Sequence, residues 1–230
     1  YAKEKLFLNI ECISIRKNNF FFISEKLVSC DAIIDCMDRN IIDKDKKRLE
    51  FVEKIRNNIS LKKDIFYIYI SSSNVYSKSS FEIDEDSNLT NEKEFSYEKN
   101  KLEVEDFLKR KFTLQNLLIT RLPSLWHLKM KNGSFMGDLV NSYKNKKVLN
   151  PRLGDDEIIS FIHIKNAAEI LFNLYLNDYY GIKNITTQEW SSRKDLKLKL
   201  KNNYKNSYGK KIITNNYNYK NFIGKKFCLL

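Results

Sequence analysis

The sequence predicts an α/β fold: a doubly wound parallel sheet with a smaller C-terminal lobe. Two observations support this prediction. Residues 65–70 (Ile-Phe-Tyr-Ile-Tyr-Ile) form an apolar run rich in β-branched and aromatic residues, which is typical of a buried strand in a parallel sheet. Runs of this kind alternate along the chain with segments whose apolar residues recur at helical spacing, the pattern of a parallel sheet covered by helices.

The other elements of the main sheet follow from the same two patterns. A helix is expected where Leu49, Val52, Ile55 and Ile59 recur at helical spacing. A strand is expected to end before Pro123, which has no backbone N–H to donate to a sheet. In chain order, the expected elements are a strand at 30–36, a helix at 44–59, the strand at 65–70, an acidic loop at 81–94, a helix at 96–110 and a strand at 117–121.

The two ends of the chain give weaker signals than its middle. Short strands are expected at 12–15 and 20–23, and residues 129–158, which contain three of the glycines, look like a separate lobe. The expected organisation is a main domain at 1–128 and a smaller lobe at 129–230, from which residues 161–176 return to the main domain. Within the smaller lobe we expect a strand at 181–186, a helix at 191–200 and an Asn/Lys/Tyr-rich tail at 201–220.

The formal net charge of +12 could indicate nucleic acid or an anionic membrane as a partner. However, the lysines are spread along the chain, and Lys, Asn, Ile and Tyr are enriched together, as an AT-rich genome would produce. We therefore expect no nucleic-acid partner and no membrane partner, and only some help from the charge in binding an anionic substrate. No apolar run reaches the roughly 18 residues that cross a membrane, and no signal peptide pattern is visible, so the expected location is cytoplasmic.

The four cysteines do not suggest a metal site. Cys12, Cys30, Cys36 and Cys228 lack Cys-x-x-Cys spacing, and the chain has only two histidines to join them. Cys30 and Cys36 flank the strand at 30–36. We expect both to be free thiols in a reducing cytoplasm.

A candidate proton-transfer site follows the strand at 65–70. The serines Ser71 to Ser73 come directly after this strand, at the sheet edge where ligands bind in open α/β folds. Tyr97 and Lys101 are spaced i, i+4 near the start of a helix, which places both side chains on one face. A phenol has a pKa of about 10, and a neighbouring ammonium favours the phenolate, so this pair could exchange a proton with a substrate hydroxyl. The alternative is a solvated helix face, because the same Tyr-x-x-x-Lys spacing recurs elsewhere in this Lys-rich chain.

Four motifs occur in a suggestive order: Ser71-Ser72-Ser73-Asn74-Val75-Tyr76, Tyr97 to Lys101, Leu118 to Pro123, and Phe161-Ile162-His163-Ile164. In this order they resemble the extended short-chain dehydrogenase/reductase family, particularly its sugar-nucleotide epimerases and dehydratases. The resemblance covers roughly residues 28–190. It implies a Rossmann-like fold, NAD or NADP as cofactor, a nucleotide-sugar substrate, and a homodimer formed through the helices at 44–59 and 96–110.

The resemblance also implies roles for individual residues. Ser72, Tyr97 and Lys101 would be catalytic, with Tyr97 as general acid/base while hydride moves to or from nicotinamide. The expected cofactor contacts are Cys36, Ser71, Tyr97, Lys101 and Pro123, and the expected substrate contacts are Ser73, Asn74 and Arg152. For Ser73 and Asn74 the alternative is a plain turn, and for Arg152 it is a solvated surface position. His163 is expected to be a structural residue of its strand.

Several departures from the family bear on function. There is no glycine before Gly133, so the Gly-rich loop that lets a backbone approach a pyrophosphate is missing from the N-terminal part. Either this loop lies upstream of Tyr1, or the chain is a non-catalytic relative that has lost cofactor chemistry. Ser72-Ser73-Asn74 stands where the dehydratases usually have Thr-Asp-Glu. The missing carboxylates disfavour dehydration and leave an epimerase or a keto-sugar reductase.

Overall fold

The computed structural model describes residues 9–12, 30–37, 46–60, 65–77, 83–90, 96–145, 147, 149, 155–185, 190–202 and 226–229. The chain divides into two compact units. Unit 1 consists of Tyr1–Arg121, Leu171–Asn184 and Asn218–Leu230, and unit 2 consists of Leu122–Ile170 and Ile185–Tyr217. The functional assignment of a dinucleotide-binding domain to 1–128 and a substrate lobe to 129–230 stays a prediction.

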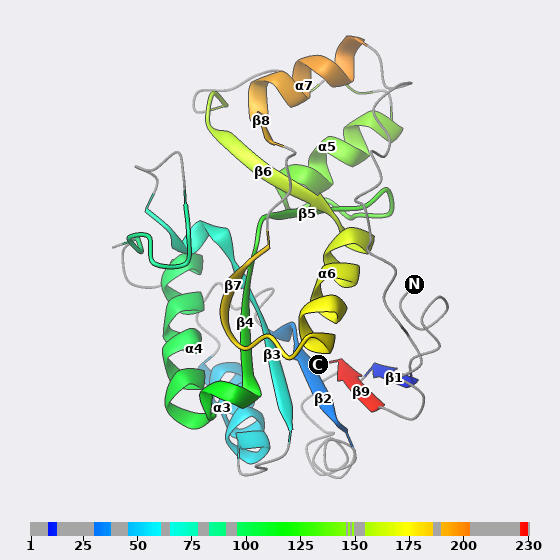
Figure 1. The fold of residues 1–230 in the computed structure, drawn as a ribbon. Helices are drawn as coiled ribbons and strands as arrows, with labels where there is room; N and C mark the ends of the chain where they lie inside the picture. Colours follow the sequence, from blue (N-terminus) through cyan, green and yellow to red (C-terminus); the bar gives the residue numbers. More distant parts are fainter. Residues whose placement is uncertain are drawn as a thin grey trace. The chain divides into compact units, whose positions relative to one another are not determined.

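Unit 1 is built on a six-stranded sheet in the order β1-β9-β2-β3-β4-β7 (Figure 1). Its strands are β1 (Asn9–Cys12), β2 (Ala32–Asp35), β3 (Phe66–Ser72), β4 (Leu117–Leu122), β7 (Gly181–Asn184) and β9 (Lys226–Leu229). The registers of the pairs β1/β9, β9/β2, β2/β3 and β4/β7 are all parallel. The predicted α/β fold, with a Rossmann-like parallel sheet, is confirmed.

Two adjacent residues of β3 show which helices cover each face of this sheet. Consecutive side chains of a strand point to opposite faces of the sheet, so the side chains of Phe66 and Tyr67 lie on opposite faces. The ring centroid of Tyr67 lies 4.6 Å from that of Phe112, the C-cap residue of α4 (Tyr97–Lys111). The ring centroid of Phe66 lies 5.2 Å from that of Tyr175, in the part of α6 (Ile164–Leu176) that belongs to unit 1. The sheet is therefore covered on both sides, as a doubly wound fold requires.

The core on the α4 face also includes α3 (Lys46–Ser60). Val52, Ile55 and Ile59, whose spacing predicted this helix, are buried. Burying a side chain of this size contributes about 1.5–3 kcal/mol relative to leaving it exposed. The buried cluster on this face comprises Cys30, Ile33, Ile55, Ile59, Ile65, Tyr67, Tyr69, Leu108, Phe112, Leu117 and Ile119.

The structure differs from the sequence-based expectation at several strands, among them β3, β7 and β9. β3 extends to Ser72, so Ser71 and Ser72 are its last residues instead of following it. β7, expected in the smaller lobe, pairs with β4 in the larger sheet. β9 was not expected at all, and it lies between β1 and β2. The strand expected at 20–23, Arg152 and residues 203–220 of the tail lie outside the described residues.

Unit 2 contains a three-stranded sheet in the order β5-β6-β8. Its elements are β5 (Ser124–Trp126), α5 (Phe135–Lys144), β6 (Ile158–His163), β8 (Trp190–Ser192) and α7 (Arg193–Asn202). β5 and β6 are parallel, and β8 pairs with β6 in the antiparallel direction. A buried ion pair of 2.5 Å between Lys197 and Asp155 ties α7 to the turn before β6.

Two further expectations from the sequence concern cysteines and membranes. Cys30 is disulfide-bonded, so the expectation that it is a free thiol was wrong, while Cys36 is outside any disulfide. Pairing of Cys30 depends on which strands the fold brings beside it, which linear spacing does not show. Among the helices that the structure describes, none is both long and apolar enough to cross a bilayer.

Candidate functional site

The candidate site begins at the carboxyl end of β3, where the strand turns into a short 3₁₀ helix, η2 (Ser73–Val75). Ser72 is the N-cap of η2, and its Oγ accepts a hydrogen bond of 3.2 Å from the backbone N–H of Asn74. Serine suits this position because its hydroxyl satisfies an N–H that has no partner within the helix. Ser72 is buried, Ser73 is half-buried and Asn74 is exposed. The chain therefore changes from sheet to turn at the residue that the sequence singled out.

Helix α4 begins beside this strand end. Its N-cap Ser96 accepts a 3.1 Å hydrogen bond from the backbone N–H of Lys99, and Glu98 places a negative charge in the first turn, where the helix dipole favours one. Tyr97, the first residue of the helix, is half-buried. These local signals fix the helix start, and with it the positions of Tyr97 and Lys101.

Lys101 is buried against the end of β3. Its side chain reaches the backbone carbonyl of Ile70, to which Nζ donates a hydrogen bond of 2.7 Å. Nζ also lies 4.8 Å from the ring centroid of Tyr69 and 5.8 Å from that of Tyr97, distances at which an ammonium is attracted to a ring face. Lys101 is 5% exposed, so these contacts take the place of water around its charge.

The structure brings Ser72, Tyr97 and Lys101 to the same end of unit 1. Helix α4 packs against both β3 and η2, and the carbonyl that Lys101 contacts is two residues before Ser72. The other predicted residues are more scattered. Cys36 is exposed just after β2, Pro123 is buried just after β4, and Arg152 lies outside the described residues. The catalytic and binding roles of all these residues stay predictions.

Ser71 is tied to a buried carboxylate that was not singled out from the sequence. Its Oγ donates a 2.5 Å hydrogen bond to Oε1 of Glu105, which is fully buried in α4. Arg121 in β4 also donates to Glu105, from Nε at 3.2 Å and from Nη2 at 2.7 Å. Burial disfavours the charged guanidinium, but the hydrogen bonds with Glu105 and Tyr76 outweigh this effect and raise the pKa of Arg121. The sequence did contain a signal, since Arg121 is the single charge in the apolar strand 117–122.

The network extends from Arg121 toward the end of β7. Nη1 of Arg121 donates to the hydroxyl of Tyr76 at 2.8 Å, and this hydroxyl donates to Oδ1 of Asn184 at 2.6 Å. The backbone N–H of Asn184 donates in turn to Oε1 of Glu85 at 2.8 Å. The polar side chains at the ends of β3, β4 and β7 are thus connected by directional contacts.

A second buried polar cluster lies at the end of β2. Asp35 accepts hydrogen bonds from Nε of Arg56 at 2.9 Å and from the hydroxyl of Tyr67 at 2.6 Å. Its other oxygen accepts from the backbone N–H of Met37 at 2.9 Å, just beyond the strand. Burial, and next the charge of Asp35, raise the pKa of Tyr67 well above its ordinary value.

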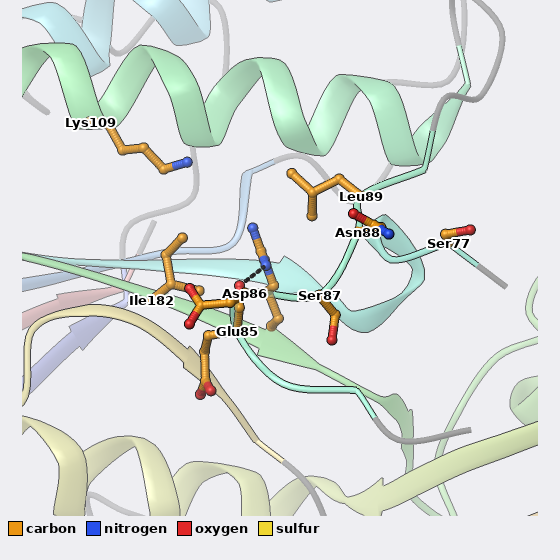
Figure 2. Close-up of a pocket in the computed structure, with 9 residues that line it drawn as sticks. Ser77, Glu85, Asp86, Ser87, Asn88, Leu89, Lys109 and Ile182 are labelled. Carbon is orange, nitrogen blue, oxygen red and sulfur yellow. Dashed lines mark hydrogen bonds between the residues drawn. The ribbon is translucent and has the colours of Figure 1, made fainter. Parts of the chain in front are cut away.

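A cavity of about 680 Å³ opens beside Arg121 in unit 1 (Figure 2). The loop that contains Glu85 forms one wall, and Figure 2 shows the side chains of Lys109 and Ile182 on other sides of it. The lining residues are Ser77, Glu85, Asp86, Ser87, Asn88, Leu89, Lys109, Arg121 and Ile182. None of the three predicted catalytic residues is among them, so we do not identify this cavity with the predicted site.

His163 is the last residue of β6 in unit 2, and its expected structural role stays a prediction. Its Nδ1 accepts a 3.2 Å hydrogen bond from the backbone N–H of Lys165, which continues the chain into α6. His127, at the end of the neighbouring strand, makes the equivalent contact with Lys129 at 3.1 Å. Burial, followed by the charges of His127 and Lys165, lowers the pKa of His163.

No protein-family model and no curated protein matches the sequence. Solved structures do share the fold. UDP-N-acetylglucosamine 4-epimerase from Bacillus cereus is similar with a TM-score of 0.65 and 16% identity, over 85% of this chain and 76% of its own. UDP-glucuronic acid 4-epimerase from Bacillus cereus, in complex with UDP-glucuronic acid and NAD, gives a TM-score of 0.62 and 16% identity, over 78% of this chain and 61% of its own. A dTDP-4-dehydrorhamnose reductase from Clostridium acetobutylicum gives a TM-score of 0.60 and 18% identity, over 79% and 65%. At these identities the similarity shows the fold alone.

Proposed function

We propose that this protein is an NAD- or NADP-dependent enzyme acting on a nucleotide-linked sugar, as an epimerase or a keto-sugar reductase. The observation that carries the proposal is the buried Lys101 ammonium, held between the Ile70 carbonyl and the Tyr97 ring at the carboxyl end of a central parallel strand. Ligands of open α/β folds bind at this edge of the sheet. The fold shared with sugar-nucleotide epimerases and a reductase supports the same proposal.

The residues present fit one end of a nicotinamide dinucleotide. A phenol, an ammonium and a serine hydroxyl at a strand end are the donors and acceptors that a ribose and a substrate alcohol require. The bound cofactor would accept or return a hydride. The phosphate end has less support, because residues 1–132 contain no glycine at which a backbone could approach a pyrophosphate closely.

In the proposed reaction, the hydroxyl of Tyr97 exchanges a proton with the substrate hydroxyl. The ammonium of Lys101 stabilises negative charge on the phenol, and the hydroxyl of Ser72 donates a hydrogen bond to the same substrate oxygen. Tyr97 belongs to a capped helix and Lys101 is buried, so both are held in place before the substrate arrives. Such preorganisation is what positions reacting groups in an enzyme.

The test is the variant Tyr97→Phe, assayed with a panel of nucleotide sugars and with NADH and NADPH. Loss of the proton donor should lower kcat by about 10²–10⁴-fold. Binding of NADH or NADPH, measured by fluorescence titration, should change little, because the ring and the packing of α4 are kept. Turnover in Tyr97→Phe equal to that of the unmodified protein would refute the role of Tyr97.

A second candidate function is a non-catalytic binding protein that keeps the fold. It would hold if the full-length gene product has no glycine-rich phosphate loop, since a weakened phosphate site would reduce cofactor affinity. The same titration separates the two candidates. Binding of a nucleotide sugar, without binding of NADH or NADPH by the full-length gene product, would support the non-catalytic candidate.

A further inference from the structure

Glu105 is a fully buried carboxylate with three protein donors. Ser71 Oγ donates to it at 2.5 Å, and Arg121 donates from Nε at 3.2 Å and from Nη2 at 2.7 Å. A buried charge is tolerated when it is paired and its hydrogen bonds are satisfied, and this one meets both conditions. The two-pronged contact with Arg121 also fixes the orientation of the carboxylate, because a guanidinium presents its donors in a rigid plane.

Glu105 lies on the same face of α4 as the predicted catalytic pair. Tyr97, Lys101 and Glu105 are spaced i, i+4 and i+8, so they follow one another along one side of the helix. Lys101 contacts the carbonyl of Ile70, and Glu105 contacts the side chain of the next residue, Ser71. Two successive turns of α4 are therefore attached to two successive residues of β3.

These two attachments can fix the helix in a way that apolar packing alone does not. Contacts such as those of buried Leu108 are non-directional, so a helix can slide or rotate slightly on them at little cost. Hydrogen bonds weaken steeply once their distance or angle changes. Arg121 is itself anchored, since it donates to the Tyr76 hydroxyl at 2.8 Å. The carboxylate of Glu105 is thus held from β4 as well as from β3.

We propose that Glu105 is a positioning residue for the predicted site: it sets the register of α4 on β3 and thereby holds Lys101 and Tyr97 beside Ser72. The inference rests on the proposed function, in which Tyr97 and Lys101 carry the proton transfer. Glu105 does not touch the substrate or the cofactor in this proposal. It acts through the helix that it shares with the catalytic pair.

The test measures how accessible the Lys101 amine is to a reagent in solution. Brief acetylation of the whole protein, followed by mass spectrometry of its peptides, gives the relative reactivity of each lysine. Lys101 is buried, whereas Lys99 is half-exposed and Lys109 is 39% exposed, so the two neighbours on the same helix are internal references. In the unmodified protein Lys101 should react slowest of the three.

Two variants of Glu105 distinguish the effect of its side-chain length from the effect of its charge. Glu105→Gln keeps the length of the side chain and its acceptor for Ser71, whereas Glu105→Asp keeps the charge and shortens the side chain by one methylene. If Glu105 sets the register, Glu105→Asp should raise the relative reactivity of Lys101 by about tenfold, a change that corresponds to easier local opening of the helix. Glu105→Gln should raise it less, because the contact to β3 can persist.

Ser71→Ala provides a variant that keeps the Glu105–Arg121 ion pair, should the charge-altering variants fail to fold. It removes the contact between Glu105 and β3, and Lys101 should again become more reactive. Thr120→Val is the matched control. It deletes another buried hydrogen bond to β3, from Thr120 Oγ1 to the Tyr69 carbonyl at 3.1 Å, and should leave the reactivity of Lys101 unchanged.

Enzyme kinetics give the second readout. In Glu105→Asp, kcat should fall while the KM for the nucleotide sugar changes little, because the substrate contacts are intact and the proton-transfer geometry is not. The proposal is overturned if the folded variants of Glu105 and Ser71 leave both Lys101 reactivity and kcat unchanged while only the thermal midpoint falls. Absence of turnover in the unmodified protein would count against the proposed function, and Lys101 reactivity would still decide whether Glu105 positions the helix.

Discussion

Tyr67 should make this protein lose stability at alkaline pH. Its hydroxyl is fully buried and donates a 2.6 Å hydrogen bond to the carboxylate of Asp35. Ionising this phenol would place a second negative charge against Asp35 in a fully buried site. Burial, followed by the charge of Asp35, therefore raises the pKa of Tyr67 in the folded protein. In the unfolded chain the same phenol should ionise near pH 10.

The sign of the effect follows from counting protons. Above pH 10 the folded state keeps the Tyr67 proton and the unfolded state loses it, so the free energy of unfolding decreases as the pH rises. One proton contributes about 1.4 kcal/mol per pH unit, so the unmodified protein should lose about 1.4 kcal/mol more than Tyr67→Phe between pH 9 and pH 11. At pH 9 the variant should be less stable by about 2 kcal/mol, the value of a hydrogen bond to a charged group. At pH 11 this difference should shrink below about 1 kcal/mol.

Urea unfolding followed by circular dichroism at pH 9, 10 and 11 measures these differences. The other 12 of the 13 tyrosines are common to both proteins, so their contributions cancel in the comparison. Phe112→Leu is a suitable control, because it loosens the ring that packs on Tyr67 but leaves the hydroxyl in place. It should lower stability and keep the pH dependence of the unmodified protein. Parallel pH curves for the unmodified protein and Tyr67→Phe would refute the reasoning.

The buried ion pair, the histidine of β6 and a glycine of α5 provide three more tests. Arg121→Met should cost about 3–5 kcal/mol because it leaves Glu105 buried without a counter-charge, and adding Glu105→Gln should recover part of this loss. A urea double-mutant cycle measures the coupling, and additive effects would contradict it. Burial, and then His127 and Lys165, lower the pKa of His163. The unfolded chain therefore binds more protons than the folded protein as the pH falls from 7 to 5, and the folded protein loses stability. Between pH 7 and pH 5 the thermal midpoint should therefore fall less for His163→Asn than for the unmodified protein. Equal decreases of the midpoint would exclude this cause. Gly137→Ala would place a Cβ against the Lys131 carbonyl oxygen, closer than van der Waals contact allows, and should cost about 1–3 kcal/mol by overpacking. A rise in the thermal midpoint of this variant would show that the loop at Lys131 relaxes instead.

The elements that the sequence predicted well are those with local signals. Helix α4 was expected at 96–110 and spans Tyr97–Lys111, because Ser96 caps it and its apolar residues recur at helical spacing. Helix α3 was predicted from the spacing of Val52, Ile55 and Ile59, which are buried. Such signals depend on residues within a few positions of one another, so they can be read without knowing the fold.

The elements that were missed or misplaced depend on contacts between distant residues. The run Phe227-Cys228-Leu229 in β9 is too short to predict a strand by itself. Its partners are β1 and β2, whose sequences carry no mark of this neighbour. Contacts between distant residues are equally hard to predict at the candidate site. The i, i+4 pair of Tyr97 and Lys101 could be found from spacing. The contact between Glu105 and Arg121 could not, because it joins a helix to a strand.

Single charges in otherwise apolar strands could nevertheless have been used. Asp35 ends the strand Ala-Ile-Ile-Asp, and Arg121 interrupts the strand Leu-Leu-Ile-Thr-Arg-Leu. A buried charge needs a partner of opposite sign, so each strand requires a complementary residue on an element that packs against it. Arg56 of α3 meets the first requirement, and Glu105 of α4 meets the second.

The two strand–helix ion pairs carry their charges in opposite order, which makes the two helices hard to exchange. At β2 the strand carries the acid and the helix carries the base, while at β4 the strand carries the base and the helix carries the acid. Exchanging α3 and α4 would bury Asp35 beside Glu105 and Arg56 beside Arg121, which costs several kcal/mol for each like-charged pair. Apolar packing alone would not distinguish the two helices so strongly, because their buried residues are of similar size and kind. The ion pairs therefore favour the observed arrangement, in which α3 pairs with β2 and α4 pairs with β4.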